Sequence, residues 1–325
     1  MATRPTIYDV ARHAGVGAKT VSRVLNGEPD VSATMRDRVQ QSIRALGYRP
    51  NSAARVLRRS IARSVGFVCE DIGEPVQARL TRAIEAVTRA QDCALTVSLT
   101  HHDPLREQAV IESLMARRVD GLVLWPTGTP SRYLRRLVDL VPLVCVDRPV
   151  DGVATDTVLC DNRVGAGLAV DFLYRQGHRR ISFVGDSAEL FTQTERLAGY
   201  RQALQERGID VDQQIIYQAD QDAIRLRRQL TYWRNSPRPP TAVVAASSVA
   251  AGALLRALSS DDPMAVVAFD DFPLADVVRG GVTVVAQDVD TIGRIAAERL
   301  FERLTGADRR DAKTIRVAPT LTERS

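Results

Sequence analysis

The chain of 325 residues is long enough for two or three domains, and its composition of 45% hydrophobic and 26% charged residues is typical of a globular protein. No apolar run approaches the roughly 18–20 residues that cross a bilayer, and the first residues lack the apolar stretch of a secretory signal. The four cysteines are widely spaced, which favours reduced thiols over a disulfide framework or a zinc site. These features exclude membrane-spanning, fibrous and secreted classes, and we expect a cytoplasmic protein.

Positive charge is concentrated at the amino end of the chain. Residues 1–60 carry eleven Lys and Arg side chains and four Asp and Glu side chains, whereas the remainder is nearly neutral. A basic head on a neutral body is typical of proteins that bind nucleic acid through a small domain. Charge alone also fits a solubilising surface or a patch that meets a membrane surface.

Three short helices are predicted in the first fifty residues. Thr6 and Asp9 approach a capping box that begins the first helix, and Gly15 and Gly47 are suited to end the first and the third. The second helix is predicted over 18–26, and Ser32 is expected to cap the third. The residues expected to face a common core are Val10, Ala11, Val21, Val24, Leu25, Met35, Val39, Ile43 and Leu46. Two short helices joined by a tight turn and braced by a third indicate a helix-turn-helix unit.

From about residue 65 onward the pattern changes to apolar strands that alternate with amphipathic stretches of helix length. Apolar runs typical of buried strands begin near residues 65, 94, 121, 143, 181, 242, 265 and 282. Such strands, separated by helices, indicate parallel sheets covered on both faces. The strands are too many for one small sheet, so we expect two α/β subdomains.

Motifs in both parts of the chain point to one family. In the head they lie at residues 7–11, 14–16, 20–26, 47–51 and 54–57. In the body they lie at residues 119–122, 146–148, 161–162, 177–181, 196–200, 269–271 and 287–288. Through these motifs essentially the whole chain resembles the LacI/GalR family of bacterial DNA-binding transcriptional regulators.

The resemblance implies an N-terminal all-α helix-turn-helix head and an α/β body of two subdomains like that of periplasmic binding proteins. The expected limits are 1–48 for the DNA-binding domain, 49–61 for a hinge helix or linker, and 62–325 for the effector-binding and dimerisation domain. Within the body, the N-subdomain would span about 62–160 and 288–317, and the C-subdomain about 161–287 and 318–325.

The implied function is that of a sequence-specific regulator, expected to be a repressor, whose affinity for operator DNA a small polar effector modulates. The implied partners are double-stranded operator DNA, an effector such as a sugar or related metabolite, and a second copy of the chain in a homodimer. No cofactor and no membrane is implied. The sequence leaves open whether the effector releases the protein from DNA or recruits it to DNA.

The resemblance assigns base reading in the major groove to Ala18, Lys19 and Arg23. Lys19 and Arg23 lie four residues apart on one helix face and can donate to guanine O6 and N7, whereas Ala18 can only touch a thymine methyl group. The side chains expected to contact the DNA backbone are Thr6, Tyr8, Thr20, Ser22, Asn26 and Ser32. The alternative is that Lys19 and Arg23 are solvated surface charges.

Residues 51–59 form a short charged segment with no apolar stripe of its own. Its arginines repel one another, so we expect it to order only when DNA phosphates neutralise it and a second copy packs against Ala54. The resemblance implies that Leu57 wedges between base pairs in the minor groove and kinks the duplex. The alternative is a flexible linker with an isolated leucine.

A crevice between two α/β subdomains, at the carboxyl ends of strands, is a natural site for a small ligand. The candidate effector-binding residues are Asp147, Arg148, Thr192, Arg196, Asp270 and Gln287. Carboxylate, guanidinium and amide groups in such positions can hydrogen-bond polyols, sugars or similar metabolites. The alternative is that these groups pair with one another and hold the crevice together.

Two departures from the family pattern concern this crevice. Ala246 and Ser247 stand where the family usually has Asn-Asp. Residues 71–76, which include Glu74 and Val76, lack the Asn-Pro-aromatic run usual in the family. A clamp for sugar hydroxyls and a platform for ring stacking are therefore missing at these positions. Either the ligand is not a typical hexose or effector control is reduced.

Other classes of protein find less support in the sequence. Residues 13–20 lack the glycines of a phosphate-binding loop, residues 101–103 have no partner cluster for a metal, and no nucleophile motif is present. We therefore expect neither catalytic nor metal-binding residues, and no enzyme. A periplasmic ligand carrier would share the two-lobed body but lack the basic head.

Overall fold

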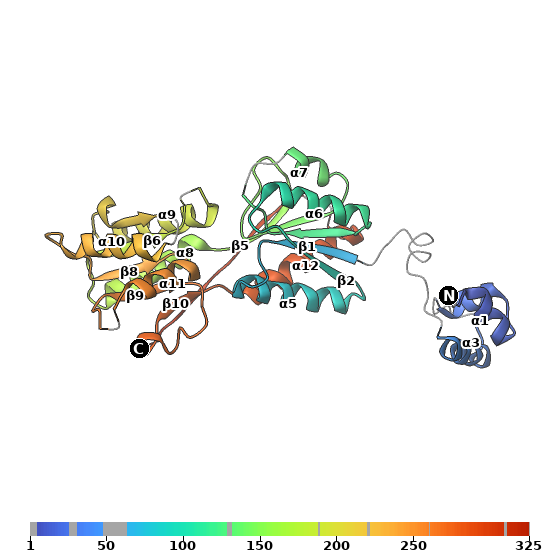
Figure 1. Cartoon of the computed structure of the whole chain (residues 1–325). Coiled ribbons are helices and arrows are strands. Elements are labelled where there is room, and N and C mark those ends of the chain that lie inside the picture. The colour runs from blue at the N-terminus through green and yellow to red at the C-terminus, as the bar shows by residue number, and fades with distance from the viewer. Residues whose placement is uncertain are drawn as a thin grey trace. The chain divides into compact units, whose positions relative to one another are not determined.

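A computed structural model describes residues 5–25, 31–47, 64–128, 132–187, 189–219, 222–259, 261–308 and 311–324. The chain divides into two units, Met1–Ala62 and Arg63–Ser325 (Figure 1), called here the head and the body. The described part of each unit has hydrophobic clusters of its own. The predicted contacts of Asn26, Ala54 and Leu57, and the whole of the predicted hinge, lie outside the described residues.

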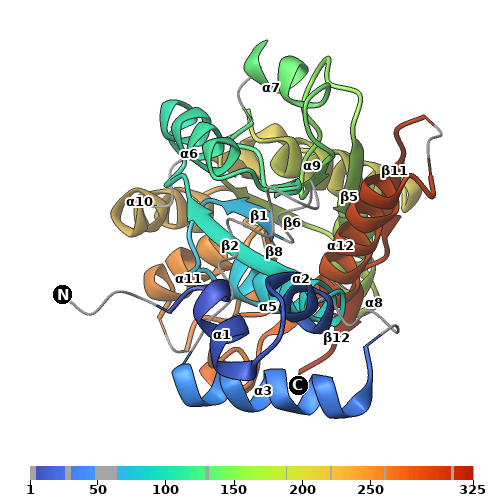
Figure 2. The same cartoon turned by 90° about the vertical axis from the view of Figure 1, so that its right-hand side faces the viewer.

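The head contains the three predicted helices, α1 (Ile7–Ala14), α2 (Ala18–Leu25) and α3 (Ala33–Leu46), and Figure 2 shows α3 running beneath the other two. The capping box of α1 is confirmed. The backbone N–H of Thr6 donates to Asp9 Oδ2 at 2.8 Å, and the backbone N–H of Asp9 donates to Thr6 Oγ1 at 3.4 Å. These bonds satisfy donors that a helix start otherwise leaves free.

Glycines end two of the head helices as predicted. Gly15 and Gly47 follow α1 and α3 with φ of 62° and 60°, the left-handed conformation that glycine adopts without a Cβ penalty. Ser32 occupies the N-cap position of α3, but its side chain makes no capping hydrogen bond. The prediction that Met35 is buried is wrong, because it lies in the first turn of α3, whereas the buried core residues of that helix begin at Val39.

The body contains two six-stranded sheets, as expected for two α/β subdomains. The first has the strand order β11-β5-β4-β3-β1-β2 and the second the order β12-β10-β9-β8-β6-β7. The strands of the first are β1 (Ser64–Cys69), β2 (Ala94–Leu99), β3 (Gly121–Leu124), β4 (Leu143–Val146), β5 (Asp156–Cys160) and β11 (Thr314–Val317). Those of the second are β6 (Ile181–Gly185), β7 (Ile216–Gln218), β8 (Ala242–Ala245), β9 (Ala265–Phe269), β10 (Thr283–Ala286) and β12 (Thr320–Thr322). All pairings are parallel except that of β12 with β10, which departs from the purely parallel expectation.

Helices cover both faces of each sheet, which explains why the strands read as nearly continuous apolar runs. On the first sheet, α5 (Pro75–Ala90) and α12 (Val289–Thr305) cover one face, and α6 (Pro104–Ala116) and α7 (Arg132–Leu137) cover the other (Figure 1). Each sheet together with its helices is called a lobe here. The helices of the second lobe are α8 (Asn162–Arg175), α9 (Phe191–Glu206), α10 (Ala223–Arg234) and α11 (Ser248–Ala257). Its short 3-10 turns are η1 (Gln213–Ile215) and η2 (Val278–Gly280). The chain passes between the two sheets three times, after β5, after β10 and after β11. This path brings residues far apart in the sequence to the junction of the lobes.

Gly199 allows a close approach between α9 and α8. A methyl group at this position would overlap the backbone carbonyl oxygen of Arg163, which cannot move as a side chain can. We expect Gly199→Ala to lower the free energy of unfolding by about 1–3 kcal/mol through overpacking. Urea denaturation followed by circular dichroism measures the change.

Gly167 of α8 provides the matched control for this prediction. A Cβ there would meet no heavy atom within 4 Å. Gly167→Ala is therefore expected to raise the free energy of unfolding by about 0.4–1 kcal/mol, since it reduces the entropy of the unfolded chain. Equal effects of the two substitutions would contradict the role assigned to Gly199.

Candidate functional site

Helix α2 carries the side chains predicted to read bases. Val21 and Val24 are buried in the head core and so fix which face of the helix points outward. Lys19 is exposed, and Arg23 is partly buried and has an interaction of its own within the chain. Ala18 is also partly buried and packs against the core, so only part of its methyl group faces outward.

The remaining predicted DNA-contact residues differ in their surroundings. Tyr8 is 69% exposed and Ser32 is exposed, whereas Thr20 and Ser22 are half-buried on α2. The hydroxyl of Thr6 donates to Asp9 Oδ2 at 2.6 Å, so its proton serves the helix cap. The hydrogen bonds that the Thr6 hydroxyl and backbone N–H donate to the Asp9 carboxylate also lower the pKa of Asp9 below its usual value.

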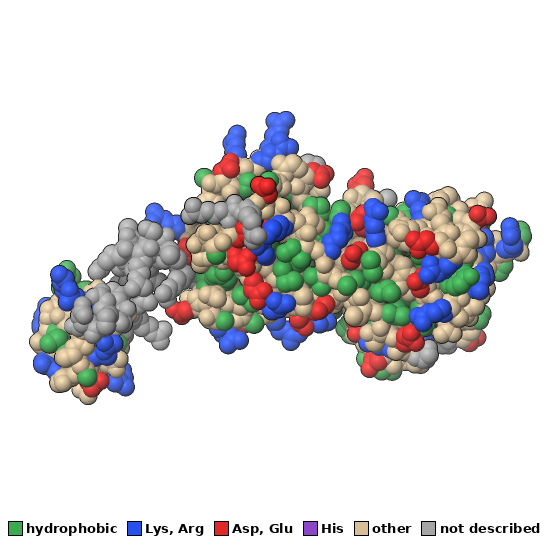
Figure 3. All heavy atoms as spheres, turned by 180° about the vertical axis from the view of Figure 1, so that it is seen from behind, with side chains coloured by type: hydrophobic (Ala, Val, Ile, Leu, Met, Phe, Trp, Pro, Cys, Tyr) green, Lys and Arg blue, Asp and Glu red, His purple; other side chains and the backbone are tan. Residues whose placement is uncertain are grey.

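Basic side chains dominate the charge of the head. Its described residues include six Lys and Arg side chains, against Asp9 and Asp37 as the acidic ones. The face of the head visible in Figure 3 carries blue basic side chains with little acidic surface between them. Such a surface attracts the phosphates of DNA without reading its sequence.

In the body, a charged cluster lies at the carboxyl ends of strands of the first sheet. Asp147 and Arg148 follow β4, and Arg148 Nε donates to Asp147 Oδ2 at 2.9 Å. Glu70, which directly follows β1, accepts from Arg148 Nη1 at 3.5 Å and lies 3.2 Å from His102 Nδ1. Burial raises the pKa of both Glu70 and Asp147 above the usual values, although Arg148 opposes the shift. Glu70 was not among the predicted residues, since a single Glu after a strand carries no pattern.

A second cluster comes from the other lobe and centres on Arg196 of α9. Its Nη1 donates to Ala246 O at 2.6 Å and to Asp270 Oδ2 at 3.4 Å, and its Nε donates to Asn162 Oδ1 at 2.7 Å. The guanidinium carbon lies 3.7 Å from the centroid of the Phe269 ring. Hydrogen bonds at the edge of the Arg196 guanidinium group and the Phe269 ring against its face therefore fix the orientation of this side chain.

Asp147 and Asp270 share an unusual backbone conformation. Each is the first residue after a strand, and each has a φ of 69°, a left-handed value that costs most non-glycine residues about 1–2 kcal/mol. Each backbone N–H nevertheless bonds to the neighbouring strand, that of Asp147 to Val158 O at 3.1 Å and that of Asp270 to Val285 O at 2.9 Å. The left-handed backbone conformation thus places one carboxylate from each lobe at the junction between the lobes. Such backbone strain occurs often at functional sites.

The other predicted effector residues lie near these two clusters. Gln287, which follows β10, donates from Nε2 to Asp270 Oδ1 at 2.6 Å. Thr192 is buried one helical turn before Arg196, on the same side of α9. Ser247, where the sequence departs from the family pattern, donates its hydroxyl to Asp186 Oδ2 at 3.0 Å. Within each lobe the predicted effector residues therefore bond to one another, Arg148 to Asp147 in the first lobe and Arg196 and Gln287 to Asp270 in the second.

Charges of the two lobes also act on each other. Burial contributes most to the raised pKa of Asp147, while Arg196 of the second lobe lowers it and Asp270 raises it. A narrow hollow beside Asp147 and Gln287 has room for no more than about one water molecule. It is lined by Val76, Leu80, Trp125, Val146, Asp147, Gln287, Val289 and Ile292. The Asp147 carboxylate and the Gln287 amide are the polar groups among these otherwise apolar walls.

Comparison with known proteins agrees with this division into head and body. Residues 6–51 match the family model of bacterial regulatory proteins of the lacI family, and residues 170–325 match that of a periplasmic binding protein-like domain. The HTH-type transcriptional regulator GalS of Salmonella typhimurium is 31% identical over 307 residues, which cover 93% of this chain and 90% of that protein. The chain belongs to the LacI family.

One further relative and two solved structures are also similar to this chain. The HTH-type transcriptional regulator GalR of Escherichia coli is 32% identical over 299 residues, covering 90% of this chain and 87% of that protein. The Lac repressor dimer bound to operator and the anti-inducer ONPF shares the fold, with a TM-score of 0.86 and 24% identity over 99% of this chain and 98% of that one. The complex of the transcriptional regulator CelR with cellobiose has a TM-score of 0.72 and 28% identity, covering 99% of both chains.

These matches confirm the family and the fold class predicted from the sequence, and they make this LacI-family member a transcriptional regulator. In the described part of the chain, no helix has the length and apolar character needed to span a membrane. No cluster of His, Cys, Asp and Glu in that part could hold a metal ion.

Proposed function

We propose that this LacI-family regulator is a repressor that binds double-stranded operator DNA as a homodimer in the cytoplasm. A small polar effector, a sugar or a related metabolite, binds between the lobes and changes the affinity for the operator. The observation that carries the proposal is that a polar side chain from each lobe, Asp147 and Gln287, lines one hollow, in a chain with a separate basic helix-turn-helix head.

In this proposal the head reads DNA through α2. Lys19 and Arg23 donate to guanine edges in the major groove and Ala18 touches a thymine methyl group, while Thr6, Tyr8, Thr20, Ser22, Asn26 and Ser32 contact the backbone. Residues 49–61 act as the hinge between a DNA-binding domain over 1–48 and an effector domain over 62–325. Ala54 packs against the second copy, and Leu57 enters the minor groove.

Regulation follows from the position of the effector residues on both sides of the junction. A ligand that bonds Asp147 and Arg148 on one lobe and Thr192, Arg196, Asp270 and Gln287 on the other favours one angle between the lobes. Operator DNA favours one arrangement of the two heads in the dimer. Since both ligands bias the same two-state dimer, the coupling between them is reciprocal.

Selection of genomic DNA fragments by the purified protein tests the function. The regulator is expected to enrich pseudo-palindromic fragments by about 10³-fold or more over scrambled competitor at moderate ionic strength. Addition of a cell extract, as a source of effector, should change that enrichment. No preference for any fragment, with or without extract, would overturn the proposed function.

Arg23→Ala tests the assignment of base reading to α2. We expect it to weaken binding to the selected fragment by about 1–3 kcal/mol and to relax specificity at one base pair of each half-site. Fluorescence anisotropy on the selected fragment and on single-base variants measures both effects. An equal loss on random DNA would instead assign Arg23 to phosphate contact.

A further inference from the structure

Lysine is rare in this chain, although arginine is abundant. Lys19 and Lys313 are the two lysines among 44 Lys and Arg residues. The two residue types differ in chemistry, because a lysine amine can be acylated in its neutral form, whereas an arginine guanidinium stays charged in proteins. A small acyl donor therefore has two lysine targets in the whole chain, one in the head and one in the body.

The side chain of Lys19 is open to solvent and to small solutes. It lies in the first turn of α2, it is exposed, and its ammonium group has no ion pair or hydrogen bond with the residues that the structure describes. None of the residues three or four positions away along α2 is acidic, and one of them, Arg23, carries the same charge. The side chains that this helix buries in the head core are Val21 and Val24. A chemical change at Lys19 therefore leaves the packing of the head intact.

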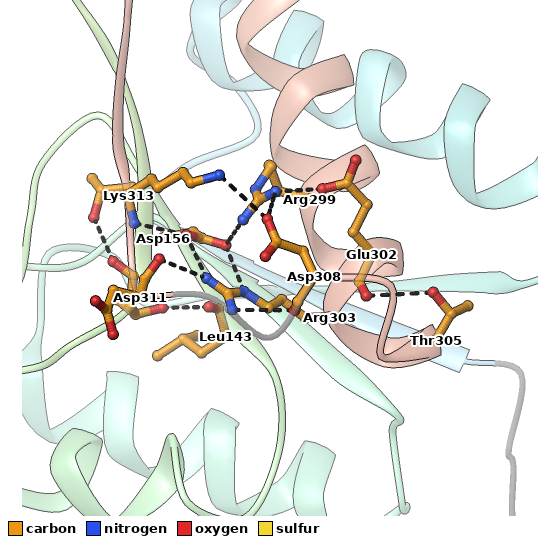
Figure 4. A network of polar contacts seen from close by, with 11 residues as sticks. Leu143, Asp156, Arg299, Glu302, Arg303, Thr305, Asp308, Asp311 and Lys313 are labelled. Atoms are coloured by element: carbon orange, nitrogen blue, oxygen red, sulfur yellow. Dashed lines mark hydrogen bonds and ion pairs between the residues drawn. The ribbon is translucent and has the colours of Figure 1, made fainter.

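Lys313 is shielded by comparison. Its Nζ lies 3.3 Å from Asp308 Oδ2, in a network of polar contacts that joins β5, α12 and the segment before β11 (Figure 4). The side chain of Lys313 is 39% exposed, and that of Asp308 is 4% exposed. This ion pair and the partial burial hinder the approach of an acyl donor to Lys313 Nζ. The structure thus makes Lys19 the more accessible of the two amines.

We propose that Lys19 is a modification site, and that transfer of an acyl group to it from an acyl phosphate releases the regulator from DNA. The neutral Nζ amine attacks the carbonyl carbon, an amide C–N bond forms, and the bond between that carbon and the phosphate oxygen breaks. Inorganic phosphate leaves, and the proton displaced from the nitrogen passes to solvent. This inference rests on the proposed reading of DNA by α2, and it adds an input that does not use the crevice between the lobes.

Acylation removes the properties that suit Lys19 for contact with DNA. The ammonium group is positively charged and has three N–H donors, whereas the amide is neutral and has one. The loss of charge weakens the attraction to phosphates beside the groove, and the acyl group enlarges a side chain that must enter it. Acylation also relieves the repulsion between Lys19 and Arg23, so the helix itself is not destabilised.

Acetyl phosphate is the probe for this site, applied to the full-length protein. Mass spectrometry of peptides measures the acetylation of each lysine, and fluorescence anisotropy measures binding to the fragment selected from genomic DNA. Lys19 is expected to be acetylated faster than Lys313. The affinity should fall as Lys19 is acetylated, by at least about fivefold at full occupancy, as for the loss of one base contact. An excess of the fragment, added before the probe, should slow the acetylation of Lys19 and leave that of Lys313 unchanged.

The matched variants Lys19→Arg and Lys313→Arg separate this site from other effects of the probe. Each keeps the positive charge and removes one acylation target. Each treated variant is compared with its own untreated sample, so that a difference in starting affinity does not enter the result. Treatment should weaken DNA binding by Lys313→Arg as much as by the wild type, and it should leave binding by Lys19→Arg unchanged. Circular dichroism should show that the treated proteins stay folded.

The inference is wrong if Lys313 is acetylated as fast as Lys19, or if full acetylation of Lys19 leaves the affinity for DNA unchanged. An equal loss of affinity in treated Lys19→Arg would also overturn it, since the effect would then arise at another group. Failure of the untreated protein to select any fragment contradicts the proposed function instead, and that experiment uses no acyl donor. The two failures are therefore distinguishable.

Discussion

Removal of residues 1–62 is expected to abolish sequence-specific DNA binding while the rest of the chain stays folded. Among the described residues, the head core around Val10, Val21 and Val39 contains no residue of the body, and the body cores contain none of the head. The deletion removes α2 and the basic side chains of the head. Because specific binding usually exceeds non-specific binding by about 10³–10⁷-fold, the loss should be at least about 10³-fold.

Binding of the selected fragment and thermal unfolding are both measured on the shortened chain. The body is expected to melt at the temperature of the corresponding transition in the full chain and to keep its affinity for any effector identified with the full chain. Retention of fragment preference by the shortened chain would contradict the assignment of DNA reading to the head. Loss of the melting transition would show instead that the two units are not independent.

Replacement of Asp156 by alanine is expected to lower the free energy of unfolding by about 3–5 kcal/mol, because it leaves buried guanidinium groups without their main partner. Figure 4 shows the network, in which the fully buried Asp156 side chain at the start of β5 accepts from two arginines of α12. Arg299 Nη2 and Arg303 Nε each donate at 2.9 Å, and the backbone N–H of Lys313 donates at 2.8 Å. Asp308 accepts from Arg299 Nη1 at 2.8 Å on the other side. The network thereby joins β5, α12 and the segment before β11.

Asp290→Ala is the matched control, since its ion pair with Arg79 is largely exposed, with 65% and 41% of the two side chains accessible. Such a pair contributes about 0–1 kcal/mol. Urea denaturation midpoints, at unchanged slope, measure both variants. A loss for Asp156→Ala no greater than that for Asp290→Ala would show that the buried network does not stabilise the fold.

The same carboxylate makes stability depend on pH. Burial of Asp156 opposes its ionisation, but hydrogen bonds from Arg303, Lys313 and Arg299 outweigh burial and hold its pKa below the usual value. A folded-state pKa below the unfolded one contributes stability that is present above about pH 4 and is lost as the pH falls toward the folded value. The difference between the wild type and Asp156→Asn should therefore shrink as the pH is lowered below about 4.

Local chemistry made much of this fold predictable from the sequence. The Thr6–Asp9 capping box and the helix ends at Gly15 and Gly47 depend on residues a few positions apart, and all three were predicted correctly. Alternation of apolar strands and helices likewise indicated two sheets covered on both faces. The family motifs placed Asp147 and Asp270 at strand ends, and the structure brings them beside Arg148, Arg196 and Gln287 as part of two linked clusters. Whether they bind a ligand stays a prediction.

The amino-acid sequence by itself determined the basic helical head, the α/β body and the family, because helix caps, periodicity and motifs are properties of neighbouring residues. Only the tertiary structure decided that Glu70 joins Arg148, that the Trp125 indole lines the hollow, and that Asp156 meets Arg299, 143 residues away. The physical reason is that hydrogen-bond partners of buried groups are set by strand order and by three crossings between sheets. Those features bring distant residues together without leaving any local pattern to read.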